Sequence, residues 1–178
     1  METIRKIGRV SLFMQILAAT FIVVLPGYHL LTWFAVDAWL QHHLAIRGVH
    51  IPVGEIIGPK FVFAFLVRTI PLAIELLVLC WMYQLFGCYR RGEVFTISTI
   101  DRFRALARML FVYTIVNPLA GAVVSVIVTT GRPGEPRMLV VGVGTPEIAA
   151  LIAGGVLATI GWVMVEAKRL ADDNTQIV

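Results

Sequence analysis

The chain has 178 residues, of which 58% are hydrophobic and 15% charged, and its formal net charge at pH 7 is +4. An ordinary soluble domain contains about 45–50% apolar residues, so this composition excludes that class. One membrane-embedded domain covering residues 1–178 is the simplest interpretation.

Four apolar runs are long enough to cross a bilayer as helices. The expected spans are residues 10–34, 61–88, 109–131 and 148–165. The first run follows basic residues, as a signal peptide does, but its uncharged stretch greatly exceeds the roughly 7–15 apolar residues of a signal sequence. We therefore predict an all-α membrane protein with four transmembrane helices.

The basic residues predict an orientation. Ten Lys and Arg residues fall in segments 1–9, 89–108 and 166–178, and four fall in the two segments expected on the opposite side, 36–60 and 132–147. By the positive-inside rule, both termini are cytoplasmic. The excess charge at that face is explained by anionic lipid headgroups, so we expect no direct nucleic-acid binding.

Two segments on the predicted outer side have strand-like sequences. Residues 48–53 and 138–143 each contain a short run of β-branched and apolar side chains. An isolated strand would leave its backbone groups unpaired, so we expect the two to pair as a small extracytoplasmic β cap.

An acid lies near the middle of the second span. Glu75 is about 21 Å from either end of that helix, at 1.5 Å rise per residue, and Arg68 lies on the same face about 10 Å nearer the outer surface. The same count puts Thr20, Asn117 and Thr159 near the midplane on the other three helices. We predict an intramembrane polar site from these five residues.

Two interpretations of Glu75 stay open. Buried polar side chains often fix the register of membrane helices, and Glu75 then has a structural role. Ionisable residues inside membranes are also commonly functional, and Glu75 is then a titratable group or the wall of a ligand cavity.

The fourth span carries small residues every four positions. Ala150, Gly154 and Ala158 predict close approach of another helix, and the segment 120–122 (Ala-Gly-Ala) is the expected counterpart. We expect this contact to lie within one chain.

The sequence contains no pattern that indicates reaction chemistry. The four histidines lie in or next to the first outer segment without ligand spacing, and Glu75 has no second acid facing it. We expect neither an enzyme nor a bound metal or cofactor.

The inner loop and the C-terminus resemble a known family. The loop is Tyr89-Arg-Arg-Gly-Glu-Val-Phe-Thr, followed by Arg102-Phe-Arg, and the end of the chain reads Val165-Glu-Ala-Lys-Arg-Leu-Ala-Asp-Asp-Asn-Thr-Gln-Ile-Val. Together they are similar to domain of unknown function family 2975, small four-helix proteins of the bacterial inner membrane. Because some members are encoded beside helix-turn-helix regulators, the resemblance implies a regulatory partnership.

Our leading hypothesis is therefore a non-enzymatic accessory or regulatory membrane protein. It presents the inner loop and tail to a protein partner in the membrane or cytoplasm, with Ser98 and Asp101 as the capping box of the helix that follows the loop. The alternative is a small-ligand- or proton-responsive protein that works through Glu75 and Arg68. The expected surface consists of Arg90, Arg91, Gly92, Phe95, Arg102, Arg104, Asp172 and Asp173.

Overall fold

The computed structural model describes residues 2–34, 58–93, 96–130 and 137–175. These residues form four helices: α1 (Glu2–Phe34), α3 (Pro59–Arg90), α4 (Ile97–Thr129) and α5 (Thr145–Thr175). Each contains a segment long and apolar enough to cross a membrane. The prediction of an all-α fold with four spans is confirmed, and the chain is a multi-pass membrane protein.

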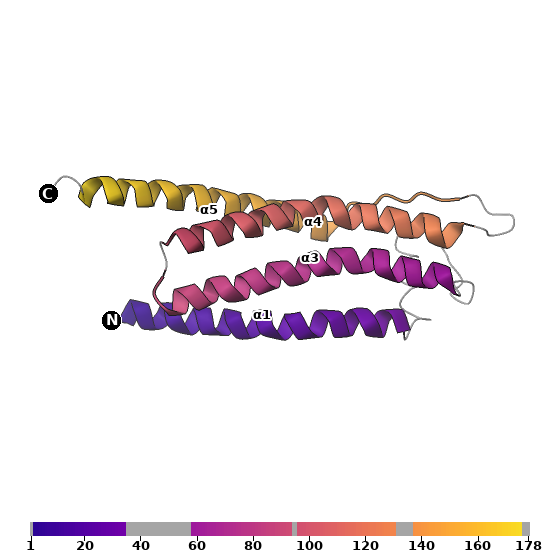
Figure 1. Cartoon of the computed structure of the whole chain (residues 1–178), viewed down its shortest axis with the longest axis horizontal. Coiled ribbons are helices and arrows are strands. Elements are labelled where there is room, and N and C mark those ends of the chain that lie inside the picture. Colours follow the sequence, from indigo (N-terminus) through magenta and orange to yellow (C-terminus); the bar gives the residue numbers. More distant parts are fainter. Residues whose placement is uncertain (1, 35–57, 94–95, 131–136, 176–178) are drawn as a thin grey trace.

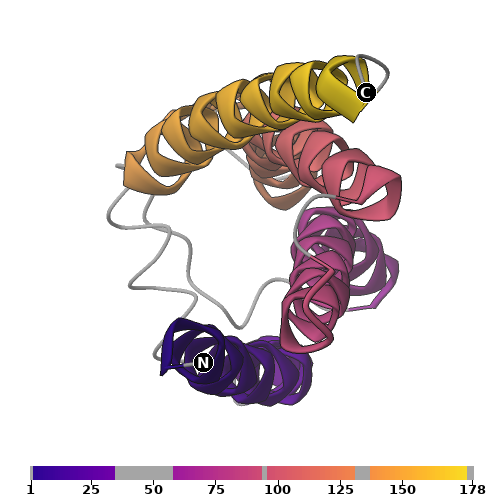
Figure 2. The same ribbon diagram turned by 90° about the vertical axis from the view of Figure 1, so that its left-hand side faces the viewer.

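The helices pack in chain order. α1 packs against α3, α3 against α4, and α4 against α5, and no other pair of helices packs together among the described residues. Figure 1 shows both termini at one end of the molecule, where α1 and α4 begin and α3 and α5 end. We call this the termini end. Seen along the helices, α1 and α5 are the outer members of an open array (Figure 2).

The apolar core is divided into two clusters along the helices. The cluster at the termini end joins α3, α4 and α5 through Leu85, Ile100, Phe103, Leu106 and Met164. The cluster at the opposite end joins α1, α3 and α4 through Trp33, Ala64, Val124 and Val128. On α3 and α4, the residues between these clusters include the polar side chains of the candidate site.

The small residues of α5 do face another helix of the same chain. A Cβ atom at Gly154 would lie 3.3 Å from the Cβ of Leu110 and 3.4 Å from both the Ala107 carbonyl oxygen and a ring carbon of Phe111. Internal packing is thus observed, but the predicted counterpart at 120–122 is wrong. α5 runs antiparallel to α4 and begins opposite Asn117, so Gly154 already meets the first half of α4.

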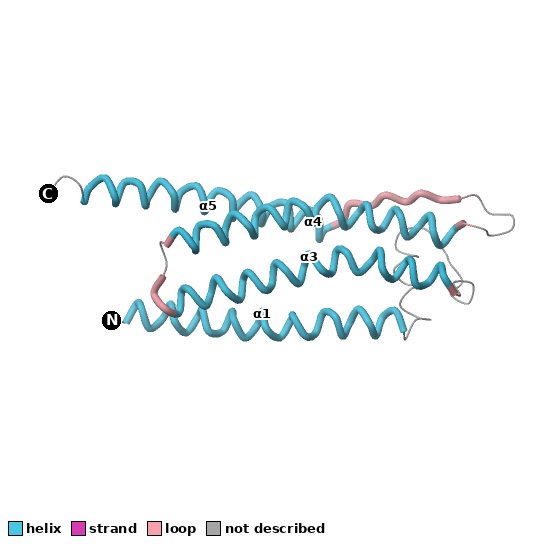
Figure 3. The backbone as a smooth tube through the Cα atoms, in the orientation of Figure 1, coloured by secondary structure: helices cyan, strands magenta, loops and turns pink. Residues whose placement is uncertain are grey.

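The segment 137–144 forms no strand, in contrast to the predicted β cap. It runs beside α4 without regular secondary structure (Figure 3), and hydroxyl groups of α4 bind its backbone. Thr129 Oγ1 accepts from the Met138 amide at 3.1 Å, and Ser125 Oγ accepts from the Val140 amide at 3.0 Å. Side chains of α4 therefore supply the hydrogen-bond partners that a second strand was expected to supply. The other predicted strand, residues 48–53, lies outside the described residues.

The α4–α5 contact predicts that substitution of two adjacent glycines affects stability differently. Gly154→Leu should lower the free energy of unfolding by about 1–3 kcal/mol, because a side chain there forces the two helices apart. Gly155→Leu is the matched control, since a Cβ there meets nothing within 4 Å. Thermal unfolding in detergent measures both variants, and equal melting temperatures would contradict the contact.

Candidate functional site

A hydrogen-bonded chain of polar side chains links α3, α4 and α5 between the two apolar clusters. Arg68 Nη1 donates to Asn117 Oδ1 at 2.7 Å, and Asn117 Nδ2 donates to Glu147 Oε1 at 2.5 Å. Asn117 is 4% exposed and Glu147 is 1% exposed. The interior of the helix array therefore contains a charged pair of residues bridged by an amide.

Glu147 is placed by the start of α5. Thr145-Pro146-Glu147 forms the first turn, where a carboxylate interacts favourably with the positive end of the helix dipole. Its second oxygen accepts from the Gly144 amide at 2.7 Å. A Cβ at Gly144 would lie 3.3 Å from that same oxygen, so the glycine leaves room for the acid.

The sequence interpretation missed Glu147. It placed the fourth span at 148–165 and counted this acid with the outer loop, whereas α5 begins at Thr145 and buries the side chain. A signal was present: threonine, proline and an acid in succession are typical of a helix start, and they extend the helix to include this residue.

Glu75 faces a cavity rather than this chain of hydrogen bonds. The cavity has a volume of about 370 Å³. Its lining comes from all four helices and is apolar apart from Glu75 and the phenol of Tyr113, which lies beside that acid. The other lining residues are Phe21, Leu25, Ile74, Val78, Leu79, Leu110, Pro146 and Ala150.

The two threonines of the predicted site are not brought to the acids. Thr20 Oγ1 donates to the Ile16 carbonyl, and Thr159 Oγ1 donates to the Gly155 carbonyl, each on its own helix and exposed. The sequence gives the depth of a residue along its helix. It does not give the direction in which the side chain points around the helix axis, and that direction keeps both threonines away from the acids. Of the five predicted residues, Arg68 and Asn117 are hydrogen-bonded to each other.

This arrangement assigns different chemistry to the two intramembrane acids. Glu147 accepts hydrogen bonds from two other parts of the chain, which is the arrangement of a structural lock. Glu75 lines the cavity together with the hydroxyl group of Tyr113. Within the described residues, no three His, Cys, Asp or Glu side chains are grouped as metal ligands.

At the termini end, the turn between α3 and α4 begins with a Schellman motif. The amide of Gly92 donates to the Tyr89 carbonyl at 3.1 Å, and that of Glu93 donates to the Cys88 carbonyl at 3.0 Å. Gly92 has a φ of 79°, a conformation that strongly favours glycine. The backbone thus reverses sharply at Gly92.

Three arginines then fix this turn. Arg90 donates to the side chain of Gln15 on α1 at 2.8 Å, and Arg91 pairs with Glu93 at 3.1 Å. Arg102 donates to the sulfur of Cys88 at 2.9 Å and to a carbonyl of α3 at 2.8 Å. These predicted surface residues are therefore engaged within the chain.

The hydrogen bond and charge of Arg91 lower the pKa of the Glu93 carboxyl below its ordinary value. The carboxylate stays ionised to lower pH than usual, so acidification through that lowered pKa removes the pair. Gln15 was missed by the sequence interpretation; nothing in its spacing distinguishes it, and its role follows from the packing of α1 on α3.

The start of α4 differs from the predicted capping box. Thr96 is the N-cap, and its hydroxyl oxygen accepts from the Thr99 amide at 3.3 Å. Ser98 is exposed within the first turn, so its assignment as the cap is wrong. The cap lies two residues earlier because the buried Thr99 hydroxyl also donates to the Glu93 carbonyl at 2.9 Å, which ties the helix start to the turn.

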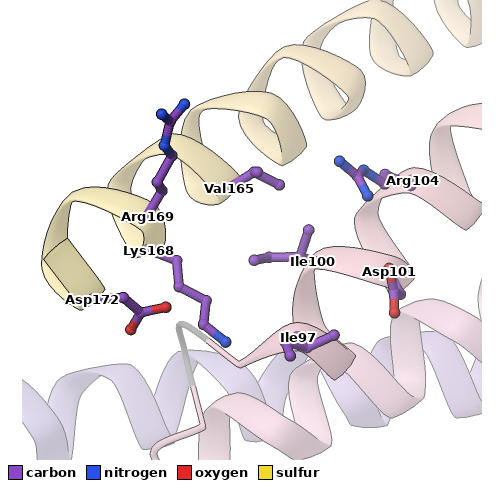
Figure 4. Close-up of a pocket in the computed structure, with 8 residues that line it drawn as sticks. All are labelled: Ile97, Ile100, Asp101, Arg104, Val165, Lys168, Arg169 and Asp172. Atoms are coloured by element: carbon purple, nitrogen blue, oxygen red, sulfur yellow. The ribbon is translucent and has the colours of Figure 1, made fainter.

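A groove lies between the start of α4 and the end of α5 (Figure 4). Its lining includes two residues of the predicted surface, Arg104 and Asp172. Ile100 and Val165 point into it from opposite helices, and Lys168 extends across it. Phe95 and the side chain of Asp173 lie outside the described part of the chain.

Asn117 is the residue to test in the intramembrane chain. Asn117→Leu should lower the free energy of unfolding by about 2 kcal/mol, because Arg68 and Glu147 each lose a hydrogen-bond partner in a buried site. Thr159→Val is the control, since that hydroxyl is exposed and bonds within its own helix. Denaturant titration in micelles measures the difference, and equal losses would contradict the role of Asn117.

Comparison with known proteins adds one result to this geometry. No curated protein and no solved structure matches the sequence significantly. A family described as "Protein of unknown function (DUF2975)" matches residues 54–178, which include α3, α4, α5 and most residues of both candidate sites. The match covers well over half of the chain, and the chain therefore belongs to the DUF2975 family.

Proposed function

We propose that this protein is a non-enzymatic accessory or regulatory protein of the bacterial inner membrane. It presents the termini end, on the cytoplasmic side, to a protein partner. The observation that carries the proposal is the junction of α3 and α4 at the termini end, where Arg90 bonds to α1 and Arg102 bonds from α4 to α3. A connection that served only to join two helices needs no such set of contacts.

A rigid surface suits recognition for an energetic reason. Ordering side chains on binding costs about 0.5–1.5 kcal/mol for each one that is immobilised, and hydrogen bonds already hold the side chains of Arg90 and Arg102 in place. The guanidinium groups that hold the turn also leave the surface basic. The partner favoured by this charge has an acidic face, and anionic lipid headgroups lie beside the same surface.

The orientation follows from charge alone. Basic residues concentrate at the termini end, and the positive-inside rule assigns such an end to the cytoplasm. A partner in the cytoplasm or in the membrane itself would then meet the turn and the end of α5 together, because both lie at that end (Figure 1).

A second function is favoured by the cavity at Glu75. Arg68 contributes one positive charge, and Glu75 and Glu147 contribute two negative charges, so the fully ionised set has a net charge of −1. That set accommodates a proton or a small lipophilic cation. His29 on α1 also lies close enough to influence Arg68, so the titratable groups here come from all four helices.

Site-specific crosslinking tests the leading proposal. A photoreactive residue in place of Ser98, exposed in the first turn of α4, should give one stoichiometric protein adduct in native membranes, and the same residue in place of Leu139, exposed at the opposite end, should not. Arg102→Ala should reduce the yield because it releases the turn, whereas Arg9→Ala on α1 should not. Equal yields from both ends, or none from either, would reject the proposal.

Hydrogen exchange tests the second function. In the wild type, protection of the amides around Asn117 should rise when tetraethylammonium, a small lipophilic cation, is added. Glu75→Gln removes the carboxylate from the cavity wall and should abolish that rise. Glu166→Gln, an exposed acid on α5, is the control and should retain it. A rise in protection that persists in Glu75→Gln would exclude Glu75 as the cation ligand.

A further inference from the structure

We propose that the groove between α4 and α5 binds an anionic phospholipid from the cytoplasmic leaflet, with its phosphate between Arg104 and Lys168. The inference concerns a different surface from the turn between α3 and α4. It depends on the predicted orientation but not on the existence of a protein partner.

Two adjoining hollows make up the groove. The outer one has a volume of about 470 Å³ and the deeper one about 520 Å³, and Asp101 and Arg104 line both. Arg104 therefore stands where the hollows join. The deeper hollow continues between the helices along Ala107, Phe111 and Ala158, with Trp162 at its edge.

The two phosphate ligands come from opposite walls. In Figure 4, the Arg104 guanidinium extends from α4 towards α5, and the Lys168 side chain extends from α5 towards α4, whereas Arg169 points away. Within the described part of the chain, neither the Arg104 nor the Lys168 side chain forms a hydrogen bond or ion pair. Ile100 lies between their charged ends in Figure 4, and both side chains are long enough to turn towards a phosphate in the hollow without breaking an existing contact.

The apolar parts of the groove match the rest of a lipid. Ile100 and Val165 point into the outer hollow, and Ile100 lies between the two cations. In the deeper hollow, Phe111 and Ala158 offer an apolar path for an acyl chain, which enters the bilayer in the same direction as the helices. Trp162 is 68% exposed, as expected for a tryptophan at the membrane interface.

Depth places the cations at the headgroups. The helices have 31 to 33 residues, about 45–50 Å at 1.5 Å per residue, and the hydrocarbon core is about 30 Å thick. The first turns of α4 and the last turns of α5 therefore extend beyond the core. Lys168 lies about 9 Å further along α5 than Trp162, on the side towards the lipid phosphates.

The acidic residues of the groove limit the charge of the headgroup. Four basic side chains (Arg104, Arg108, Lys168 and Arg169) and two acidic ones (Asp101 and Asp172) line the two hollows, a net charge of +2. A headgroup with several phosphates would be repelled by the two carboxylates. A headgroup with one phosphate fits, and the carboxylate of Asp101, which lines both hollows, accepts hydrogen bonds from headgroup hydroxyls, so phosphatidylglycerol has the matching chemistry.

Native mass spectrometry of the full chain tests the site. The wild-type protein in detergent should retain phosphatidylglycerol in preference to phosphatidylcholine with the same acyl chains. Arg104→Gln/Lys168→Gln should weaken phosphatidylglycerol binding about 30-fold, because each basic residue near an anionic lipid contributes about fivefold. Glycerol phosphate, which has the headgroup without acyl chains, should not displace the lipid.

The control removes the same charge elsewhere at the termini end. Lys6→Gln/Arg9→Gln on α1 should bind phosphatidylglycerol as the wild type does, and thermal unfolding should show both double variants folded. Equal loss in both double variants would assign binding to overall surface charge and overturn the proposal. Equal binding of phosphatidylglycerol and phosphatidylcholine by the wild type would also overturn the proposal. The same holds if the groove variant loses a crosslinked protein while its lipid binding is unchanged.

Discussion

The hydrogen-bonded chain Arg68–Asn117–Glu147 is the constraint on which the rest of the structure depends. Each member comes from a different helix, and at least two are almost completely buried. Sliding α3, α4 or α5 along its neighbour would leave a buried polar group without its partner, which costs about 1–3 kcal/mol. The apolar clusters on either side tolerate such movement more readily, because dispersion contacts are not directional.

Because this register is fixed, the other features take defined positions. Gly154 lies against α4 so that the helices approach closely, and the segment before α5 runs back along α4 to bring Gly144 to the Glu147 carboxylate. At the termini end, the same register aligns the start of α4 with the end of α5. The groove of Arg104 and Lys168 is thus a consequence of how far two antiparallel helices extend past each other.

The open arrangement of the helices determines which helices line the cavity at Glu75. α1 packs only on α3 and α5 only on α4 among the described residues, yet both contribute to the lining around Glu75. A cavity bounded by two helices that do not pack together changes shape when either moves. Glu75 therefore borders a space whose shape depends on the helix arrangement, whereas the hydrogen bonds of Glu147 help to hold that arrangement.

The sequence by itself determined the four helices, their order and the membrane class, because these depend on the length and composition of apolar runs. It also identified Arg68, Glu75 and Asn117, since an ionisable or amide side chain inside such a run is conspicuous. Only the tertiary structure decided which side chains form hydrogen bonds with one another. Rotation about each helix directed Thr20 and Thr159 to their own backbones, the early start of α5 buried Glu147, and packing of α1 on α3 gave Gln15 its role. Those outcomes depend on contacts between distant segments, which no local pattern of residues specifies.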